Sequence, residues 1–172
     1  GEYSNKVQAT LDGITTPAIE EKVVVVDLAK SASPTTIFAG NTVTYTVSAK
    51  NNGQVVVNSL KLIDSPDLTN FTYKAGSAKV NGASIADPVS GGGKLTFTAG
   101  TNVPSGATVT LTYEMISKAN IPVGTYPNKV HGELTVGSKT SLTGEKEVTV
   151  KVVNNGVTKE ADNKYIIAGD EV

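Results

Sequence analysis

Short runs of alternating apolar and polar residues, bounded by Gly, Asn or Pro, recur along this chain. The clearest is Thr42–Lys50, where every second residue from Val43 to Ala49 is apolar and the residues between them are Thr or Ser. A period of two places the apolar side chains on one face of a strand and the polar side chains on the other. These runs therefore predict half-buried β-strands, and no helical pattern of useful length accompanies them.

About eight strands are predicted in this way: Val23–Lys30, Thr42–Lys50, Val55–Asp64, Phe71–Val80, Lys94–Ala99, Thr108–Met115, Asn128–Val136 and Glu147–Val153. Their spacing is typical of an all-β, immunoglobulin-like sandwich of about 7–9 strands with extra terminal strands. Asn51-Asn52-Gly53 predicts a hairpin turn, since Asn and Gly tolerate positive φ. Asn81-Gly82 predicts another turn. Two prolines and a glycine predict a loop over Lys118–Pro127.

The sandwich is expected to occupy residues 23–153, with a tail on each side. Residues 1–22 hold one alternating segment, Tyr3–Leu11, followed by Asp12-Gly13 and a Thr-Thr-Pro linker. Residues 154–172 hold a short apolar patch, Tyr165-Ile166-Ile167. Each tail is expected either to add a strand to its own sandwich or to donate a strand to the open sheet edge of another copy.

Composition excludes several classes of function. The net charge is -1 and aromatic residues make up 5% of the chain, which leaves no basic surface for phosphates and few rings to stack on bases. Nucleic-acid binding is therefore not expected. No apolar run approaches the roughly 20 residues of a membrane span. The absence of Cys excludes disulfides and thiolate metal sites, so the fold must be stabilised in another way.

Several motifs, in this order and spacing, resemble a known family: Leu28–Pro34, Ala39–Val47, Lys50–Gly53, Leu60–Pro66, Val103–Leu111 and Asn128–Val130. Together they resemble the conserved-repeat domain, number eleven among the domains of unknown function, of bacterial and archaeal surface proteins. They are also similar to the Gram-positive pilin domains that carry internal isopeptide bonds. The resemblance covers about residues 23–153. It implies an immunoglobulin-like sandwich with a structural or adhesive role.

An internal isopeptide bond joins a Lys amine to an Asn carboxamide beside an acid, and all three side chains must be buried. Burial favours the neutral, nucleophilic amine, and a protonated acid polarises the Asn carbonyl. Lys30 is in phase with the apolar residues of its strand, and so are Asp64 and Asn128. The resemblance implies the same three residues. Glu114 is an alternative acid, but it alternates with core residues and is expected to face solvent.

The competing interpretation is that these residues lie at strand ends. There a Lys is usually solvated, and Asn and Asp are usual in turns. Asp64 has a further alternative, which is to share a calcium ion with Asp67 and loop carbonyls, although no calcium-loop motif occurs. His131, the one histidine, is expected to be an exposed strand residue. Asn70 begins the one glycosylation motif, Asn70-Phe71-Thr72. No cofactor, resident metal or catalytic residue is expected.

The function expected is that of a secreted, non-enzymatic subunit of a cell-surface fibre or pilus. Its partners are expected to be copies of itself, assembled by strand exchange, and the surface of a host or neighbouring cell. One alternative is a stalk, S-layer or adhesin module of a larger surface protein. Another is a carbohydrate-binding module, but such modules expose aromatic residues, and here most of the six Tyr and three Phe are in core phase.

Overall fold

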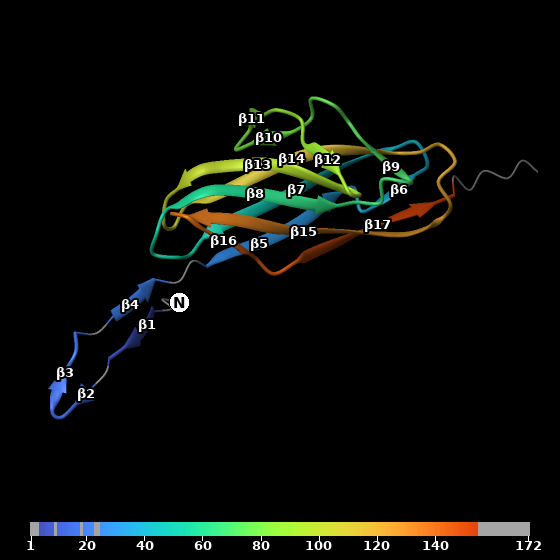
Figure 1. Ribbon diagram of the computed structural model, residues 1–172. Helices are drawn as coiled ribbons and strands as arrows, with labels where there is room; N and C mark the ends of the chain where they lie inside the picture. Colours follow the sequence, from blue (N-terminus) through green and yellow to red (C-terminus); the bar gives the residue numbers. More distant parts are fainter. Residues whose placement is uncertain (1–3, 9, 18, 23–24, 155–172) are drawn as a thin grey trace, which may run out of the picture.

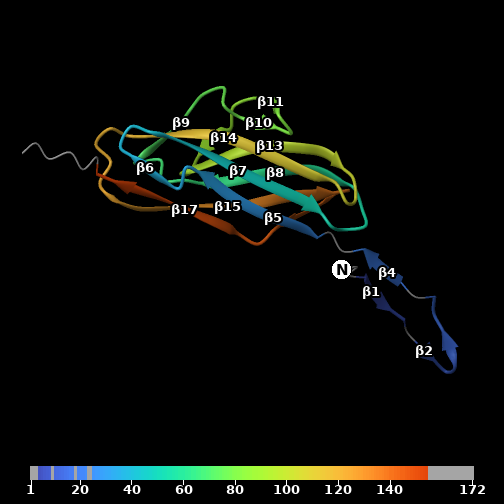
Figure 2. The same cartoon turned by 180° about the vertical axis from the view of Figure 1, so that it is seen from behind.

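The computed structural model describes residues 4–8, 10–17, 19–22 and 25–154, and within these ranges every regular element is a strand. Two sheets face one another and form a sandwich (Figure 1). Figure 2 shows the same layers from behind. The predicted all-β sandwich is therefore confirmed.

The first sheet has the strand order β11-β10-β14-β7-β5, with β9 also paired to β14. Its strands are β5 (Val26–Ser33), β7 (Thr42–Asn51), β9 (Phe71–Tyr73), β10 (Lys79–Val80), β11 (Ala83–Ser84) and β14 (Thr108–Ser117).

The second sheet has the order β12-β13-β8-β15-β17-β6, with β16 also paired to β15. Its strands are β6 (Thr36–Phe38), β8 (Val57–Ser65), β12 (Val89–Gly91), β13 (Lys94–Val103), β15 (Gly124–Val136), β16 (Lys139–Leu142) and β17 (Lys146–Val153). The pairing of β17 with β6 is parallel, and the other pairings are antiparallel.

The core lies between the two sheets and follows the period of two in the sequence. Along β7 the residues from Val43 to Ala49 alternate between buried and half-buried, and β14 repeats the pattern. Antiparallel register places Tyr45 opposite Tyr113 and Val47 opposite Leu111, so the buried side chains of neighbouring strands contact one another. Apolar burial at about 25 cal/mol per Å² is the main force that holds the sheets together.

The Asn51-Asn52-Gly53 segment is not a hairpin turn, contrary to the prediction. β7 and β8 belong to different sheets, so the chain crosses the sandwich here. The buried Asn51 amide holds this corner: its Nδ2 donates to Val55 O (2.8 Å) and Val103 O (3.1 Å). Its Oδ1 accepts from the Gly53 amide at 3.0 Å. None of these three residues has a positive φ, and local sequence does not reveal which sheet the next strand joins.

Replacing Asn51 with Ala is expected to lower the free energy of unfolding by about 2–3 kcal/mol, because two buried carbonyls and one amide lose their partner. Urea denaturation followed by circular dichroism measures this change. Asn52→Ala is the matched control, because the Asn52 Nδ2 donates to the exposed Asp27 carboxylate at 2.5 Å and not to buried backbone carbonyls. Equal losses in the two variants would contradict the role given to Asn51.

Two further segments differ from the prediction. Residues 71–80 form two short strands, β9 and β10, and both pair with β14. The expected loop over residues 118–127 ends early, because β15 begins at Gly124 and includes Pro127. Proline is tolerated there because the pairing of β15 with β8 begins only at Lys129, so β15 has one neighbour at Pro127. The predicted turn at Asn81-Gly82 is present, with φ of 49° and 83°.

The described part of residues 1–22 is a β-hairpin and not a single alternating strand followed by a linker. β1 (Ser4–Val7) pairs with β4 (Ile19–Lys22), and β2 (Thr10–Leu11) pairs with β3 (Ile14–Thr15). Asp12 and Gly13 form the turn with positive φ. The hairpin lies beyond the end of the sandwich at which β5 begins (Figures 1 and 2). Residues 155–172, with the expected C-terminal strand, lie outside the described residues.

Candidate functional site

Lys30, Asp64 and Asn128 come from both sheets and meet in the core. Lys30 lies on β5 of the first sheet, while Asp64 and Asn128 lie on the neighbouring strands β8 and β15 of the second. Asp64 is opposite Val130, so Asn128 is its diagonal neighbour on the same face. None of the three ends its strand: Lys30 and Asn128 lie inside β5 and β15, and Ser65 follows Asp64 in β8. The strand-end interpretation is therefore wrong.

Lys30 and Asp64 form an ion pair between the two sheets. The Lys30 Nζ donates to Asp64 Oδ1, and both side chains are completely buried, at 0% exposure. Burial lowers the pKa of the Lys30 amine, and the neighbouring Asp64 carboxylate opposes this effect. The neutral, nucleophilic form of the amine is therefore easier to reach here than on a protein surface.

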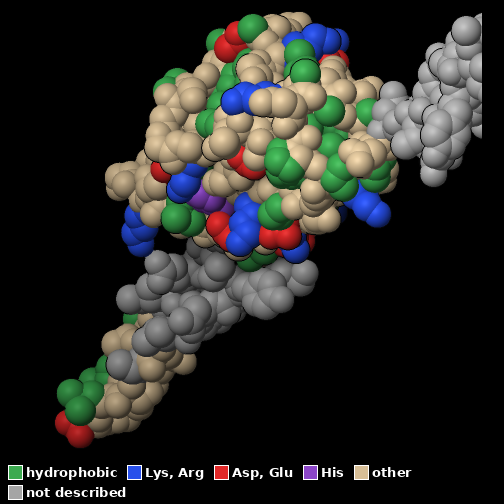
Figure 3. All heavy atoms as spheres, turned by 90° about the vertical axis from the view of Figure 1, so that its right-hand side faces the viewer, with side chains coloured by type: hydrophobic (Ala, Val, Ile, Leu, Met, Phe, Trp, Pro, Cys, Tyr) green, Lys and Arg blue, Asp and Glu red, His purple; other side chains and the backbone are tan. Residues whose placement is uncertain are grey.

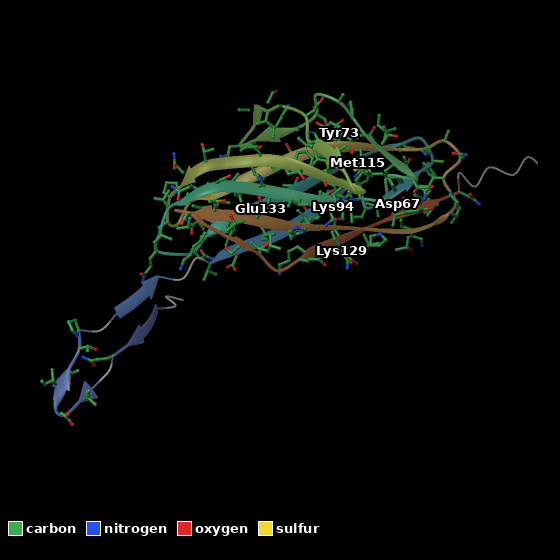
Figure 4. All side chains as sticks on the ribbon, in the orientation of Figure 1. Asp67, Tyr73, Lys94, Met115, Lys129 and Glu133 are labelled. Atoms are coloured by element: carbon green, nitrogen blue, oxygen red, sulfur yellow. The ribbon has the colours of Figure 1, made fainter. Side chains whose placement is uncertain are left out.

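This pair differs from the other ion pairs between described residues, which lie on the surface. Lys61 contacts Glu133 at 2.8 Å, and both side chains are at least 30% exposed. Lys129 lies 3.6 Å from Glu145 and is half exposed. Figure 4 labels Lys129 and Glu133 along β15. Surface pairs of this kind contribute little to stability, whereas a buried pair carries a desolvation cost that calls for a reason.

Asn128 completes the site. It is 2% exposed, and its Nδ2 donates to the Tyr113 hydroxyl at 3.2 Å. Its Oδ1 has no hydrogen-bond partner, and neither does Asp64 Oδ2. Among the described side chains these two oxygens are the buried polar atoms without a partner. A buried acceptor left unpaired costs about 1–3 kcal/mol, so two on adjacent strands require an explanation.

Aromatic rings surround the three polar groups. Lys30 Nζ lies 5.2 Å from the centre of the Tyr45 ring. Tyr45 stacks on Tyr113 with ring centres 5.4 Å apart, and Tyr113 packs against Phe97 at 4.8 Å. Burial raises the pKa of Tyr45 to about 12 and raises that of Tyr113 well above its usual value, with Asp64 adding to both shifts. Both hydroxyls are therefore neutral at physiological pH.

Sequence reasoning did not include the two tyrosines in the site. Tyr45 and Tyr113 are in phase with the core residues of β7 and β14, and they were read only as core. The signal that points to them is the hydroxyl, since a buried Tyr oxygen normally has a polar partner. Two tyrosines at core positions, together with three other polar residues expected in the core, therefore indicate that their polar groups form one cluster.

The remaining predicted residues lie elsewhere. Glu114 faces outward and pairs with Lys74 at 2.5 Å. Asp67 accepts hydrogen bonds from the Thr69 amide (3.0 Å) and Asn70 Nδ2 (2.7 Å). The glycosylation candidate Asn70 is half-buried, and so is His131, which was expected to be exposed.

The described residues contain no group of three His, Cys, Asp or Glu side chains placed to hold a metal ion. No helix in the described part of the chain is long and apolar enough to cross a membrane. Figure 3 looks onto the end of the sandwich opposite the one at which β5 begins. Acidic and basic side chains are mixed over that face.

No protein-family model and no curated protein matches this sequence. Solved structures do match. AvmM, which catalyses macrocyclization in alchivemycin A biosynthesis, is 13% identical with a TM-score of 0.56, and the match covers 90% of this chain and 99% of AvmM. BcpA, the major pilin subunit of Bacillus cereus, is 16% identical with a TM-score of 0.54, over 86% of this chain and 47% of BcpA.

The N-terminal domain of the Streptococcus gordonii adhesin Sgo0707 is 14% identical with a TM-score of 0.53, over 74% of this chain and 32% of that one. This chain therefore spans about half of the pilin and a third of the adhesin structure. At these identities the matches show the fold: a sandwich similar to those of Gram-positive pilin and adhesin domains.

Proposed function

We propose that this protein is a non-enzymatic structural subunit of an extracellular fibre or pilus, and that a Lys30–Asn128 isopeptide bond staples its sandwich. The observation that carries the proposal is the fully buried Lys30–Asp64 pair beside Asn128, between the two sheets. The likeness to pilin and adhesin domains supports the same function and an extracellular location.

The bond would form by transfer of the Asn128 acyl group from ammonia to Lys30. Lys30 first gives one proton to Asp64, which leaves a neutral amine and a neutral acid in the dry core. The acid then donates its proton toward Asn128 Oδ1 while Lys30 Nζ attacks Asn128 Cγ. The Cγ–Nδ2 bond breaks, Nδ2 leaves as ammonia with a proton from Nζ, and Asp64 ends protonated.

The proton on Asp64 also accounts for the two unpaired oxygens. Asp64 Oδ2 and Asn128 Oδ1 are both acceptors in the charged pair, so neither can satisfy the other. Once Asp64 is protonated it becomes a donor, and one hydrogen bond can serve both atoms.

The place of the bond suits a subunit under tension. β5 begins at the end of the sandwich beside the hairpin, and β17 ends at the opposite end (Figure 1). A force applied at the two ends of the chain would pass from Lys30 directly to Asn128. Residues 31–127 would then lie in a closed covalent loop that the force does not stretch. In a fibre subunit without cysteines, the bond would limit unfolding in the way that a disulfide does in other secreted proteins.

The N-terminal hairpin supports assembly by strand exchange. In the described part of the chain β1 and β4 pair with each other and with no further strand, so each leaves one edge unpaired there. An isolated two-stranded hairpin is marginally stable in water, and an unpaired edge is a template for another strand. At its tip Leu11 and Ile14 are opposite one another and 76% exposed. Pairing with a sheet edge of a second copy would bury these groups and join the subunits in a chain.

Electron microscopy of the purified protein tests the assembly. The full chain is expected to form filaments, and a variant lacking residues 1–22 is expected to stay monomeric with its sandwich intact. A variant lacking residues 155–172 tests the other end of the chain in the same way. Monomers of the full chain, together with no effect of removing residues 1–22, would exclude strand exchange through the hairpin.

A stalk or adhesin module of a longer surface protein is the second candidate. It is favoured by one observation, which is that this chain spans only half of the pilin and a third of the adhesin structure that it resembles. In that case the isopeptide bond would still form, but the isolated chain would not polymerise. Microscopy therefore separates the two functions, since the intact mass is expected to be the same in both.

A further inference from the structure

The Tyr113 hydroxyl accepts a hydrogen bond from Asn128 Nδ2 at 3.2 Å, and the Tyr45 hydroxyl lies beside the same amide. Tyr113 is 0% exposed and lies on β14 of the first sheet, whereas Asn128 lies on β15 of the second. A phenylalanine would fill the same space without placing a hydroxyl in an apolar core, which costs free energy unless it is paired. The hydroxyl therefore needs a reason, and its partner is the amide nitrogen that would leave as ammonia.

The Tyr113 ring is held from two sides. Tyr45 stacks on it from the adjacent strand with an interplanar angle of 21°, and Phe97 packs on it from the facing sheet with an angle of 34°. β14 is itself paired with β7 over nine successive positions, from Thr108 to Ile116. The hydroxyl is therefore fixed relative to both sheets, as a group that positions a reactant must be.

The amide nitrogen fixes the direction of this hydrogen bond, because an amide NH₂ donates and cannot accept. Burial and the nearby Asp64 raise the pKa of Tyr113 far above neutrality, so the group is a neutral phenol. A phenol oxygen accepts a hydrogen bond from an amide N–H, and the amide oxygen then points the other way. The Asn128 amide is thereby held with Nδ2 toward Tyr113 and with Oδ1 unbonded.

We propose that Tyr113 is a positioning residue for the isopeptide reaction. Its hydroxyl holds the Asn128 carboxamide with the leaving nitrogen on the Tyr113 side and the carbonyl oxygen free for the Asp64 proton. The face of Cγ is thereby presented to Lys30 Nζ, and the amide cannot rotate into the reverse arrangement. This role rests on the proposed bond between Lys30 and Asn128.

The test is the rate of ammonia loss in Tyr113→Phe. The full chain is synthesised in a cell-free reaction, samples are quenched in denaturant at successive times, and intact mass gives the fraction that has lost ammonia. Removing the hydroxyl keeps the ring contacts but frees the amide, so bond formation is expected to be about ten- to a hundredfold slower than in the wild type. A Tyr113→Phe variant that reacts at the wild-type rate would overturn the proposal.

Tyr73→Phe is the matched control. It removes one hydroxyl from a tyrosine that also packs on Phe97, with ring centres 6.2 Å apart, but the Tyr73 hydroxyl bonds Asp87 at 2.7 Å, away from the site. This variant is expected to react at the wild-type rate. If the wild-type protein itself kept its full sequence mass, the isopeptide bond would be excluded and the role of Tyr113 with it. The two failures are therefore distinguishable.

A second measurement does not depend on the reaction. In Lys30→Met no bond can form, so the Asn128 side-chain NH₂ remains and can be observed by nuclear magnetic resonance. Adding Tyr113→Phe to this background is expected to shift the NH₂ signals and to speed their exchange with solvent protons, because their acceptor is gone. Unchanged signals would show that Tyr113 does not hold the amide.

Discussion

Purified protein is expected to weigh about 17 Da less than its sequence mass, because one ammonia is lost when Lys30 attacks Asn128. Trypsin cleaves after Lys and cannot cleave after an acylated Lys30. The digest is therefore expected to contain one branched product, in which the peptide 23–50 is joined to the peptide 119–129. Tandem mass spectrometry locates the branch point.

Four variants make this prediction specific. Lys30→Ala, Asn128→Ala and Asp64→Ala are each expected to keep the full mass of their own sequence, because each lacks the nucleophile, the acyl donor or the acid. Glu114→Gln is the matched control, since this acid was the sequence-based alternative and lies on the outer face beside Lys74. It is expected to lose ammonia as the wild type does. Loss of ammonia from Asp64→Ala, or its retention in Glu114→Gln, would contradict the role given to Asp64.

Removing the cross-link is expected to produce the largest loss of stability. The bond closes a loop of about 100 residues, and the chain-entropy model for a cross-link of that span gives about 4 to 5 kcal/mol. Asn128→Ala is therefore expected to lower the free energy of unfolding by at least this amount, measured by guanidinium denaturation. Ser117→Ala is the reference variant. It measures how much stability is lost when a buried polar side chain away from the site is truncated, since Ser117 is 2% exposed.

A double variant separates the cross-link from other losses. Lys30→Met and Asn128→Ala each remove the same bond, so the cost of the cross-link is counted once in the double variant. The loss in free energy of unfolding in the double variant is therefore expected to be smaller than the sum of the losses in the two single variants. Additive losses, or an Asn128→Ala loss no larger than that of Ser117→Ala, would mean that no staple holds the native protein.

Much of the fold could be predicted from the sequence, because a period of two is a local property. Thr42–Lys50 and Thr108–Met115 each showed which residues would face the core, and both strands have the predicted burial. The same parity placed Lys30, Asp64 and Asn128 on inner faces, where all three side chains are buried in the structure. Turn chemistry was equally local at Asn81-Gly82.

Strand partners could not be predicted in this way. Asn51-Asn52-Gly53 looked like a hairpin turn, but the next strand joins the other sheet, and residues 1–22 looked like one strand, but the described part folds back on itself. Both outcomes depend on contacts between residues distant in the sequence, which a turn motif does not specify. The tolerance of Pro127 also depends on strand pairing, because β15 has no second neighbour at that point.

The candidate site shows the same division. The sequence by itself determined that three polar residues of suitable chemistry face inward on three strands, because the direction of a side chain follows from strand parity. Only the tertiary structure decided that β5 lies across the sandwich from β8, which brings Lys30 against Asp64, the diagonal neighbour of Asn128. It also decided that the Tyr113 hydroxyl meets the Asn128 amide. Proximity between sheets depends on packing, and packing is a property of the whole chain.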